Sequence, residues 1–168
     1  VGSQYETSKR AVEIAERYSE GVYSAIGLHP IHLAEGIFKV KLDEEEIAFQ
    51  TQDEHFDYEK YRELAKSPKT VAVGEIGLDY YYKPKTKKKL AEFKEKQRTV
   101  LCQQLKLAEE LNLPVIFHCR VAHKDLLEIL NYKLKTTNYQ LKGVMHGFVG
   151  AAEQLEKYLE MGFYFGYN

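Results

Sequence analysis

Four residues that can bind metal or move protons each follow a short apolar run. They are His29 after Ile26–Leu28, Glu75 after Val71–Gly74, His118 after Val115–Phe117 and His146 after Val144-Met145. Any one of them alone is more often a hydrogen-bonded structural residue than a ligand. Three in the same topological place, Glu75, His118 and His146, favour a shared site. One carboxylate with two imidazoles is a mixed nitrogen and oxygen donor set suited to Mg, Mn or Zn.

The apolar runs have the length and composition of buried strands, and stretches with helical periodicity separate them. This alternation predicts an α/β protein with a parallel sheet. The predicted strands are Val22–Leu28, Val71–Ile76, Pro114–His118, Gly143–His146 and Phe163–Gly166. The predicted helices are Thr7–Tyr18, Tyr58–Ala65, Leu90–Asn112, His123–Leu130 and Ala151–Met161. In a parallel α/β barrel the loops after the strands converge on one mouth, so residues at those strand ends lie together.

Residues 36–56 break this alternation with mixed polar residues and the acidic run Asp43-Glu44-Glu45-Glu46. We expect this segment to be an insertion, and we expect the acidic run to form a solvated face. Nothing else in the sequence indicates a linker between domains. The rest of residues 1–168 is therefore predicted to form a single domain.

Four motifs resemble, in order and spacing, those of the TatD family of metal-dependent deoxyribonucleases. They are Gly27-Leu28-His29-Pro30, Gly74-Glu75-Ile76-Gly77-Leu78-Asp79-Tyr80-Tyr81, Pro114-Val115-Ile116-Phe117-His118-Cys119-Arg120 and Met145-His146-Gly147-Phe148. The resemblance covers nearly the whole chain apart from residues 36–56. It implies a TIM-like (β/α) barrel of the metal-dependent hydrolase type, with one or two divalent ions and activity on the phosphodiester bonds of DNA.

The resemblance also implies roles for individual residues. Glu75 would be the metal-bridging carboxylate and the catalytic residue, and His118 and His146 would be metal ligands. The family also has a His-x-His pair on its first strand and an aspartate in a Glu-Thr-Asp context on its last, and this sequence contains neither. We therefore expect a partial barrel that lacks both strands. The absence of an initiator Met before Val1 agrees with a fragment.

Three further residues are candidates for binding substrate. His29 is expected to face it. Arg120 could pair with a phosphate in bidentate fashion, although a surface salt bridge explains an arginine here equally well. Asp79 is expected to orient a ligand or to cap a turn. We expect His32, His55 and His123 at the surface, and Cys119 as a small buried residue.

The segment Tyr80–Lys89 combines three tyrosines with five lysines directly after the glutamate motif. Lysines attract phosphates, and tyrosine rings offer faces on which unpaired bases stack. A solvated helix start is the alternative, but lysines at a helix N-terminus oppose the helix dipole. This segment is therefore a candidate contact with DNA.

Composition limits the other classes of function. With 24 Lys and Arg against 25 Asp and Glu, the chain has no general attraction to nucleic acid or acidic membranes. Cys102 and Cys119 have neither disulfide nor zinc-ribbon spacing, which favours a reducing, cytoplasmic setting. No apolar run approaches the roughly 20 residues that span a bilayer.

Two alternatives to a nuclease stay open. The first is a related hydrolase that uses the same metal ligands on another ester or an amide, since fold and ligands do not fix specificity. The second is a truncated module without catalysis that binds nucleic acid or associates with itself. Open edges of an incomplete barrel sheet would favour such self-association.

Overall fold

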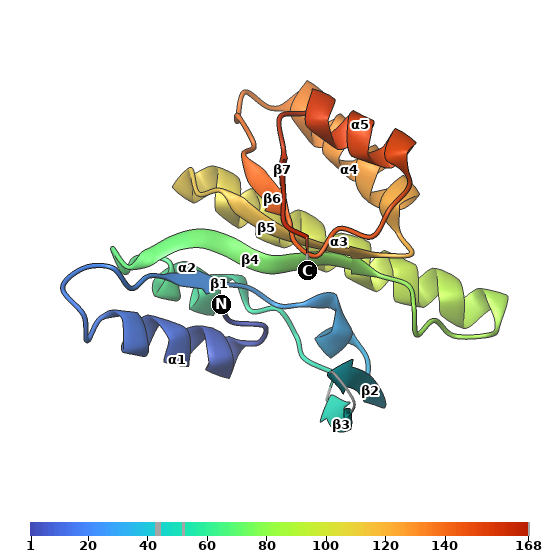
Figure 1. Cartoon of the computed structure of the whole chain (residues 1–168), viewed down its shortest axis with the longest axis horizontal. Coiled ribbons are helices and arrows are strands. Elements are labelled where there is room, and N and C mark those ends of the chain that lie inside the picture. Colours follow the sequence, from blue (N-terminus) through green and yellow to red (C-terminus); the bar gives the residue numbers. More distant parts are fainter. Residues whose placement is uncertain (43–44, 52, 168) are drawn as a thin grey trace.

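Five parallel strands organise the protein, as its computed structural model shows in Figure 1. The order across the sheet is β1-β4-β5-β6-β7, and each neighbouring pair is parallel. The strands are Ser24–Ile26 (β1), Thr70–Asp79 (β4), Val115–Arg120 (β5), Gly143–Met145 (β6) and Tyr164–Phe165 (β7). The structure describes residues 1–42, 45–51 and 53–167.

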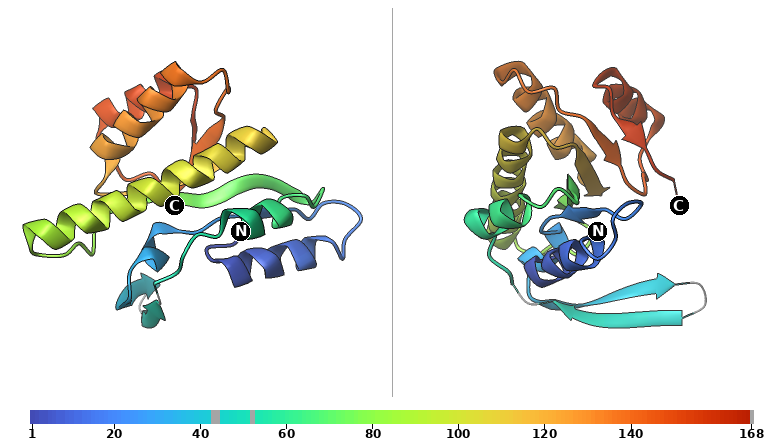
Figure 2. Two further views of the ribbon diagram at one scale, coloured as in Figure 1. Left: turned by 180° about the vertical axis from the view of Figure 1, so that it is seen from behind. Right: turned by 90° about the vertical axis from the view of Figure 1, so that its left-hand side faces the viewer.

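Helices alternate with these strands along the chain and lie on one side of the curved sheet (Figure 2). They are α1 (Tyr5–Ala15), the short 3-10 helix η1 (Pro30–Leu33), α2 (Tyr58–Leu64), α3 (Lys87–Leu111), α4 (His123–Thr136) and α5 (Ala152–Glu160). Helix α3 ends where Asn112 adopts a left-handed conformation, two residues before Pro114. The predicted fold class, a partial TIM-like barrel of parallel βα units, is confirmed.

Strand β5 shows how the sheet separates its core from its other face. Val115, Phe117 and Cys119 are buried, whereas Ile116, His118 and Arg120 between them are partly exposed. Successive side chains of a strand point to opposite faces. One face of β5 therefore contributes to the hydrophobic core, and the other carries polar groups. Cys119 is a buried residue of that core, as predicted.

The core consists of two hydrophobic clusters. The larger one packs β4 and β5 against α3, α4 and α5, with Phe117, Leu126 and Tyr158 almost completely buried. The smaller one joins α1, β1, α2 and α3 through residues such as Ile26 and Tyr61. Burying a side chain of this size stabilises a fold by about 1.5–3 kcal/mol. Helix α3 contributes to both clusters and so connects the two parts of the sheet.

The predicted insertion, residues 36–56, contains a separate two-stranded antiparallel sheet. Strands β2 (Gly36–Leu42) and β3 (Glu45–Thr51) pair from Gly36 with Thr51 to Leu42 with Glu45. Figure 2 shows this hairpin projecting from the rest of the molecule. The side chains of the acidic run at 43–46 lie outside the described part of the chain. The single-domain assignment stays a prediction.

The two edges of the five-stranded sheet differ. Residues 2 and 3 run beside β1, where Gly2 N donates to Ala25 O at 2.8 Å and His29 N donates to Ser3 O at 2.9 Å. The edge strand β7 instead carries Tyr164, which is 75% exposed. The predicted self-association through sheet edges stays a prediction. None of the helices in the described ranges has the length and apolar character to cross a membrane.

Two histidines expected at the surface are buried instead. His123 begins α4 with its ring turned inward, where Nδ1 lies 3.2 Å from the Tyr158 hydroxyl and Nε2 lies 3.1 Å from Val149 O. His32 lies in η1 and is 9% exposed. The expectation failed because other segments cover both residues: the rings of Tyr158 and Phe148 pack against His123, and η1 packs against β4. His55 is exposed, as expected.

Candidate metal centre

His29, Glu75 and His118 form one group on the structure. One potential ligand atom from each lies within 4.8 Å of the other two, and all three side chains are partly buried. Nδ1 of His118 is 3.1 Å from Oε1 of Glu75, and Nε2 of His29 is 3.9 Å from the same oxygen. Among the described residues this group has the donor types and spacing that a divalent ion requires.

Three adjacent strands bring these residues together. His29 follows β1, Glu75 lies within β4, and His118 lies within β5. Strand β4 continues four residues beyond Glu75 to Asp79, so the expectation that the strand ends near Glu75 is wrong. The register with β5 shifts between Gly74 and Ile76, which makes Glu75 an extra residue in the ladder. Such a bulge re-aims a side chain, and here the re-aimed side chain is the glutamate.

Asp79 is a second carboxylate on the other side of His118. Its Oδ2 lies 3.1 Å from His118 Nε2, while Glu75 holds Nδ1, so His118 bridges two acids. Asp79 is only 5% exposed. If an ion takes the place between Glu75 and His118 Nδ1, the bond from His118 Nε2 to Asp79 remains. That is the carboxylate–histidine–metal arrangement, in which the outer acid fixes the ring orientation.

His29 and the two carboxylates of this site have pKa values that suit a bound cation, whereas His118 does not share this property. Burial acts to lower the pKa of His118, but the hydrogen bonds with Asp79 and Glu75 outweigh it and raise the pKa, so an ion bound there would displace a proton. Burial lowers the pKa of His29 to about 3, with a further contribution from His118, so His29 is neutral. Burial acts to raise the pKa of Asp79, but hydrogen bonds from His118 and Arg120 outweigh it and lower the pKa to about 2. Glu75 shows the same balance, and its pKa is lowered mainly by His118 and His29. Ionised carboxylates and a neutral imidazole are the forms that bind metal.

Arg120 is occupied by Asp79 and by two aromatic rings. Its Nη2 lies 2.8 Å from Asp79 Oδ2, and its Nε donates to the same carboxylate at 3.0 Å. Its guanidinium carbon lies 4.4 Å from the ring centroid of Tyr81 and 5.3 Å from that of Tyr82. The arginine predicted to bind phosphate thus holds a buried carboxylate, and its side chain is 38% exposed.

His146 is exposed and immediately follows β6, as the sequence predicted. Its backbone N donates to Phe117 O at 2.9 Å, which ties it to the middle of β5, one residue before His118. It lies near enough to Glu75 to contribute to the lowered pKa of that residue. It is not part of the group formed by His29, Glu75 and His118. The prediction that His146 is a ligand therefore stays a prediction, and His29 enters the site as a further candidate.

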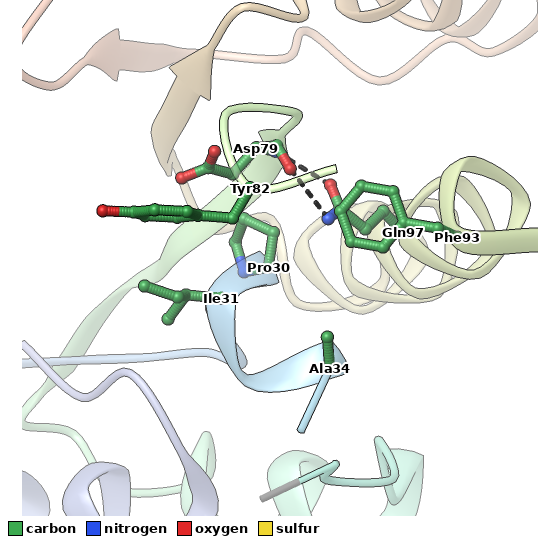
Figure 3. A pocket seen from close by; sticks show the side chains of 7 residues that line it. All are labelled: Pro30, Ile31, Ala34, Asp79, Tyr82, Phe93 and Gln97. Atoms are coloured by element: carbon green, nitrogen blue, oxygen red, sulfur yellow. Dashed lines mark hydrogen bonds between the residues drawn. The ribbon is translucent and has the colours of Figure 1, made fainter. Parts of the chain in front are cut away.

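Two buried glutamines of α3 hold the segments that carry the site, and sequence reasoning missed both. Gln97 donates to Asp79 O at 3.0 Å and accepts from Asp79 N at 2.8 Å, the bonds drawn in Figure 3. Gln104 forms the equivalent pair with Leu28. Each glutamine is 1% exposed. Their spacing of seven residues, two helical turns, among the apolar residues of α3 was the signal that could have revealed them.

A small pocket lies beside Asp79, between η1 and the start of α3. Figure 3 shows the ring of Tyr82 close to the Asp79 carboxylate and to the Pro30–Ile31 turn. The residues that line the pocket are Pro30, Ile31, Ala34, Asp79, Tyr82, Phe93 and Gln97. The turn after His29 and the segment after Asp79 therefore line the same pocket.

Gly77 allows β4 and β5 to approach each other at the site. It pairs with His118 and has a φ of 153°. A Cβ added at Gly77 would lie 1.8 Å from the carbonyl oxygen of His118. Any side chain there would push away the strand segment that carries the histidine.

A parallel βα barrel with acidic and imidazole donors at its mouth defines the class of metal-dependent barrel hydrolases. The sequence profile described as TatD related DNase matches residues 1–168, and the chain belongs to this family. It is 33% identical over 168 residues to the uncharacterized metal-dependent hydrolase YabD of Bacillus subtilis, covering 100% of this chain and 55% of that protein.

Two further relatives agree with this assignment. The 3'-5' ssDNA/RNA exonuclease TatD of Erwinia tasmaniensis is 32% identical, over 95% of this chain and 51% of its own length. The crystal structure of YjjV, a TatD homologue from Escherichia coli, superimposes with a TM-score of 0.71 at 31% identity, covering 98% of this chain and 53% of that one. The chain thus spans about half the length of these relatives.

Proposed function

We propose that this chain carries part of the active site of a metal-dependent hydrolase that cleaves phosphodiester bonds in DNA. Glu75 is the catalytic carboxylate and a metal ligand, and His118 is a second ligand. His29 and His146 are the candidates for the remaining protein positions. A divalent ion held there would supply an activated water and polarise the phosphoryl oxygen.

The observation that carries this proposal is the position of His118 between two carboxylates. An ordinary histidine–carboxylate pair uses one ring nitrogen. His118 instead has Glu75 at Nδ1 and Asp79 at Nε2, each at 3.1 Å. Glu75 is in turn within 4.8 Å of a donor of His29. A buried acid that orients a histidine from behind is the usual support of a metal ligand. We therefore assign Asp79 to orienting His118 and not to direct contact with substrate.

The donor set favours Mg, Mn or Zn without choosing among them. Glu75 offers oxygen, and His29 and His118 offer nitrogen. Imidazole suits Zn, while carboxylate suits Mg and Mn, so a mixed set accepts either kind.

DNA is the proposed substrate, and the lysines of the segment Tyr80–Lys89 are its proposed contact. Lys83, Lys85, Lys87, Lys88 and Lys89 are all exposed. None of them has an acidic partner within the described ranges, and the first turn of α3 contains no acid. Five exposed lysines close together in sequence repel one another, and a bound polyanion would relieve that repulsion.

A metal-dependent nuclease assay tests the proposal. We expect the 168-residue chain to bind divalent metal weakly and to cut DNA slowly, because it supplies few of the ligands that two ions need. The same chain flanked by the barrel segments of its relatives should release nucleotides from single-stranded DNA when Mg or Mn is added. In that longer protein, Glu75→Gln should reduce the rate by orders of magnitude.

The control is His55→Ala, which changes an exposed histidine away from the group and should leave the rate unchanged. An inert longer protein with Mg, Mn and Zn, or a Glu75→Gln variant of normal rate, would contradict the nuclease. Activity on other esters or amides would then support the related hydrolase. DNA binding without hydrolysis of any ester or amide would support the non-catalytic module.

The cytoplasmic setting and the self-association also belong to this proposal. Both cysteines are free thiols, Cys102 exposed and Cys119 buried, which agrees with a reducing compartment. The edge strand β7 exposes Tyr164 and would be the surface for a second copy. Sedimentation of the chain at several concentrations tests the second point.

A further inference from the structure

We propose that Tyr81 is the residue on which an unpaired terminal nucleobase stacks while the adjoining phosphate lies at the candidate metal centre. The inference rests on the proposed function, because it assumes a nucleic-acid substrate at Glu75 and His118. It goes beyond that function by naming one ring as the determinant for a base that is free of its partner strand.

The three consecutive tyrosines after Asp79 differ sharply in exposure. Tyr80 is 4% exposed, belongs to the larger hydrophobic cluster and has Lys94 over its ring. Tyr81 is 58% exposed. Tyr80 therefore serves the core, and Tyr81 presents its ring to solvent at the mouth of the sheet.

The exposed ring of Tyr81 is held in place on two sides. The guanidinium carbon of Arg120 lies over it at 4.4 Å from the centroid, and the ring of Tyr82 meets it nearly at right angles with centroids 4.8 Å apart. An aromatic side chain fixed by its neighbours loses little further freedom when a ligand stacks on it. Such a fixed, exposed ring is suited to stacking with a base of any sequence.

Tyr81 is also tied to the residues of the metal centre. Its backbone N donates to Asp79 Oδ1 at 2.9 Å, and Asp79 Oδ2 lies 3.1 Å from His118 Nε2. The carboxylate that orients His118 thus also fixes the start of the segment that carries the ring. A base on Tyr81 and a phosphate at His118 would be positioned by the same aspartate.

Arg120 acts here as a positioning residue. Its two bonds to Asp79 and its place over Tyr81 connect the acid to the ring. The exposed Lys83 and Lys85 follow in the same segment and supply the positive charge for the DNA backbone. Two kinds of residue in this segment therefore have different roles. The lysines attract phosphates, and Tyr81 selects for a base that is available to stack.

The competing explanation is that Tyr81 only closes the turn after β4. In that case its replacement would lower stability without changing any preference among ligands. The two explanations are separated by removing the terminal base and the tyrosine ring independently. The loss of binding affinity from each change can then be compared with the loss from both together.

The experiment uses two fluorescent single-stranded oligonucleotides that differ only in the 3'-terminal residue, thymidine in one and an abasic residue in the other. Binding is measured by fluorescence anisotropy in EDTA, so that the DNA stays intact whether or not the protein is a nuclease. The variants are Tyr81→Leu and Tyr81→Phe. Tyr132→Leu is the control, because Tyr132 is 71% exposed at the far end of α4.

The unsubstituted protein should bind the thymidine oligonucleotide about 5- to 150-fold more tightly than the abasic one, the range that stacking of one base provides. Tyr81→Leu should reduce this ratio to about one, while Tyr81→Phe and Tyr132→Leu should keep it. The proposal is overturned if Tyr81→Leu and the unsubstituted protein give the same affinity ratio. It is also overturned if the unsubstituted protein gives a ratio of one or does not bind. Loss of nuclease activity alone would leave the ratio intact and would count only against the proposed function.

Discussion

The side-chain amide of Gln104 forms hydrogen bonds with both backbone polar atoms of Leu28, at 2.7 Å to N and 3.1 Å to O. Leu28 immediately precedes His29, so a helical residue 76 positions away in sequence fixes the segment that carries a candidate ligand. Gln97 does the same for Asp79 at the end of β4. Helix α3 therefore sets the spacing between two parts of the site.

Gln104→Leu should lower the free energy of unfolding by about 1–3 kcal/mol, because it leaves the buried N–H and C=O of Leu28 without partners. Urea denaturation measures the change. Gln103→Leu is the matched control, since Gln103 is the exposed neighbour on the same helix and should change stability little. Equal effects of the two substitutions would show that the buried hydrogen bonds of Gln104 contribute nothing specific.

Gly77→Ala should be far more damaging than Gly162→Ala. Both glycines have positive φ, but a Cβ at Gly162 would meet nothing within 4 Å, whereas one at Gly77 would meet the His118 carbonyl at 1.8 Å. Gly162→Ala should cost about 1–2 kcal/mol for the left-handed backbone alone. Gly77→Ala should cost at least about 3 kcal/mol, in the range of the largest single-residue effects. Thermal unfolding followed by circular dichroism compares them, and similar losses would refute the close approach of β4 and β5.

Metal titration of two histidine variants should establish which histidine completes the site. His29→Ala should weaken binding of Mn or Zn by at least about tenfold, the effect expected for a group at a metal. His146→Ala should have the same effect if it is a ligand, and little effect if His29 is used in its place. Calorimetric titration with His55→Ala as control makes the distinction. Unchanged affinity in both variants would remove both residues from the proposed site.

The two cysteines should react at very different rates with a thiol reagent. Burial raises the pKa of both thiols, but Cys102 is exposed at the surface, whereas Cys119 is buried in the core and its pKa is raised to about 12. At pH 8 Ellman's reagent should therefore modify one thiol per folded chain and the second only after denaturant is added. Mass spectrometry of the modified peptide identifies the residue. Rapid reaction of Cys119 in the folded chain would contradict its burial between β5 and the helices.

Much of the fold could be predicted because buried parallel strands leave short apolar runs. The five strands and the helices between them follow from that pattern, and so does the place of His118. The course of β4 could not be predicted in the same way. An acidic residue at 75 looks like the end of a strand, and only pairing with β5 shows that the strand continues through a bulge.

Contacts between distant segments account for the rest of the site. His29 was expected to face substrate, and its closeness to Glu75 depends on how β1 lies against β4, which no local pattern encodes. Arg120 was considered for phosphate because its sequence neighbours do not reveal that Asp79 holds it. A glutamine in an apolar helix face, such as Gln97, indicates a buried partner but does not say which one.

Because side chains alternate between the two faces of β5, the register of that strand matters as much as its composition. His118 and Arg120 occupy one parity of position, and Phe117 and Cys119 occupy the other. Losing one residue just before Val115 would exchange the parities, pressing a histidine and an arginine into the packed interior and placing a phenyl ring at the mouth. Substitutions on either face of β5 can therefore be made one at a time. Insertions and deletions cannot, because the strand tolerates a change of residue type at one position but not a shift of its register.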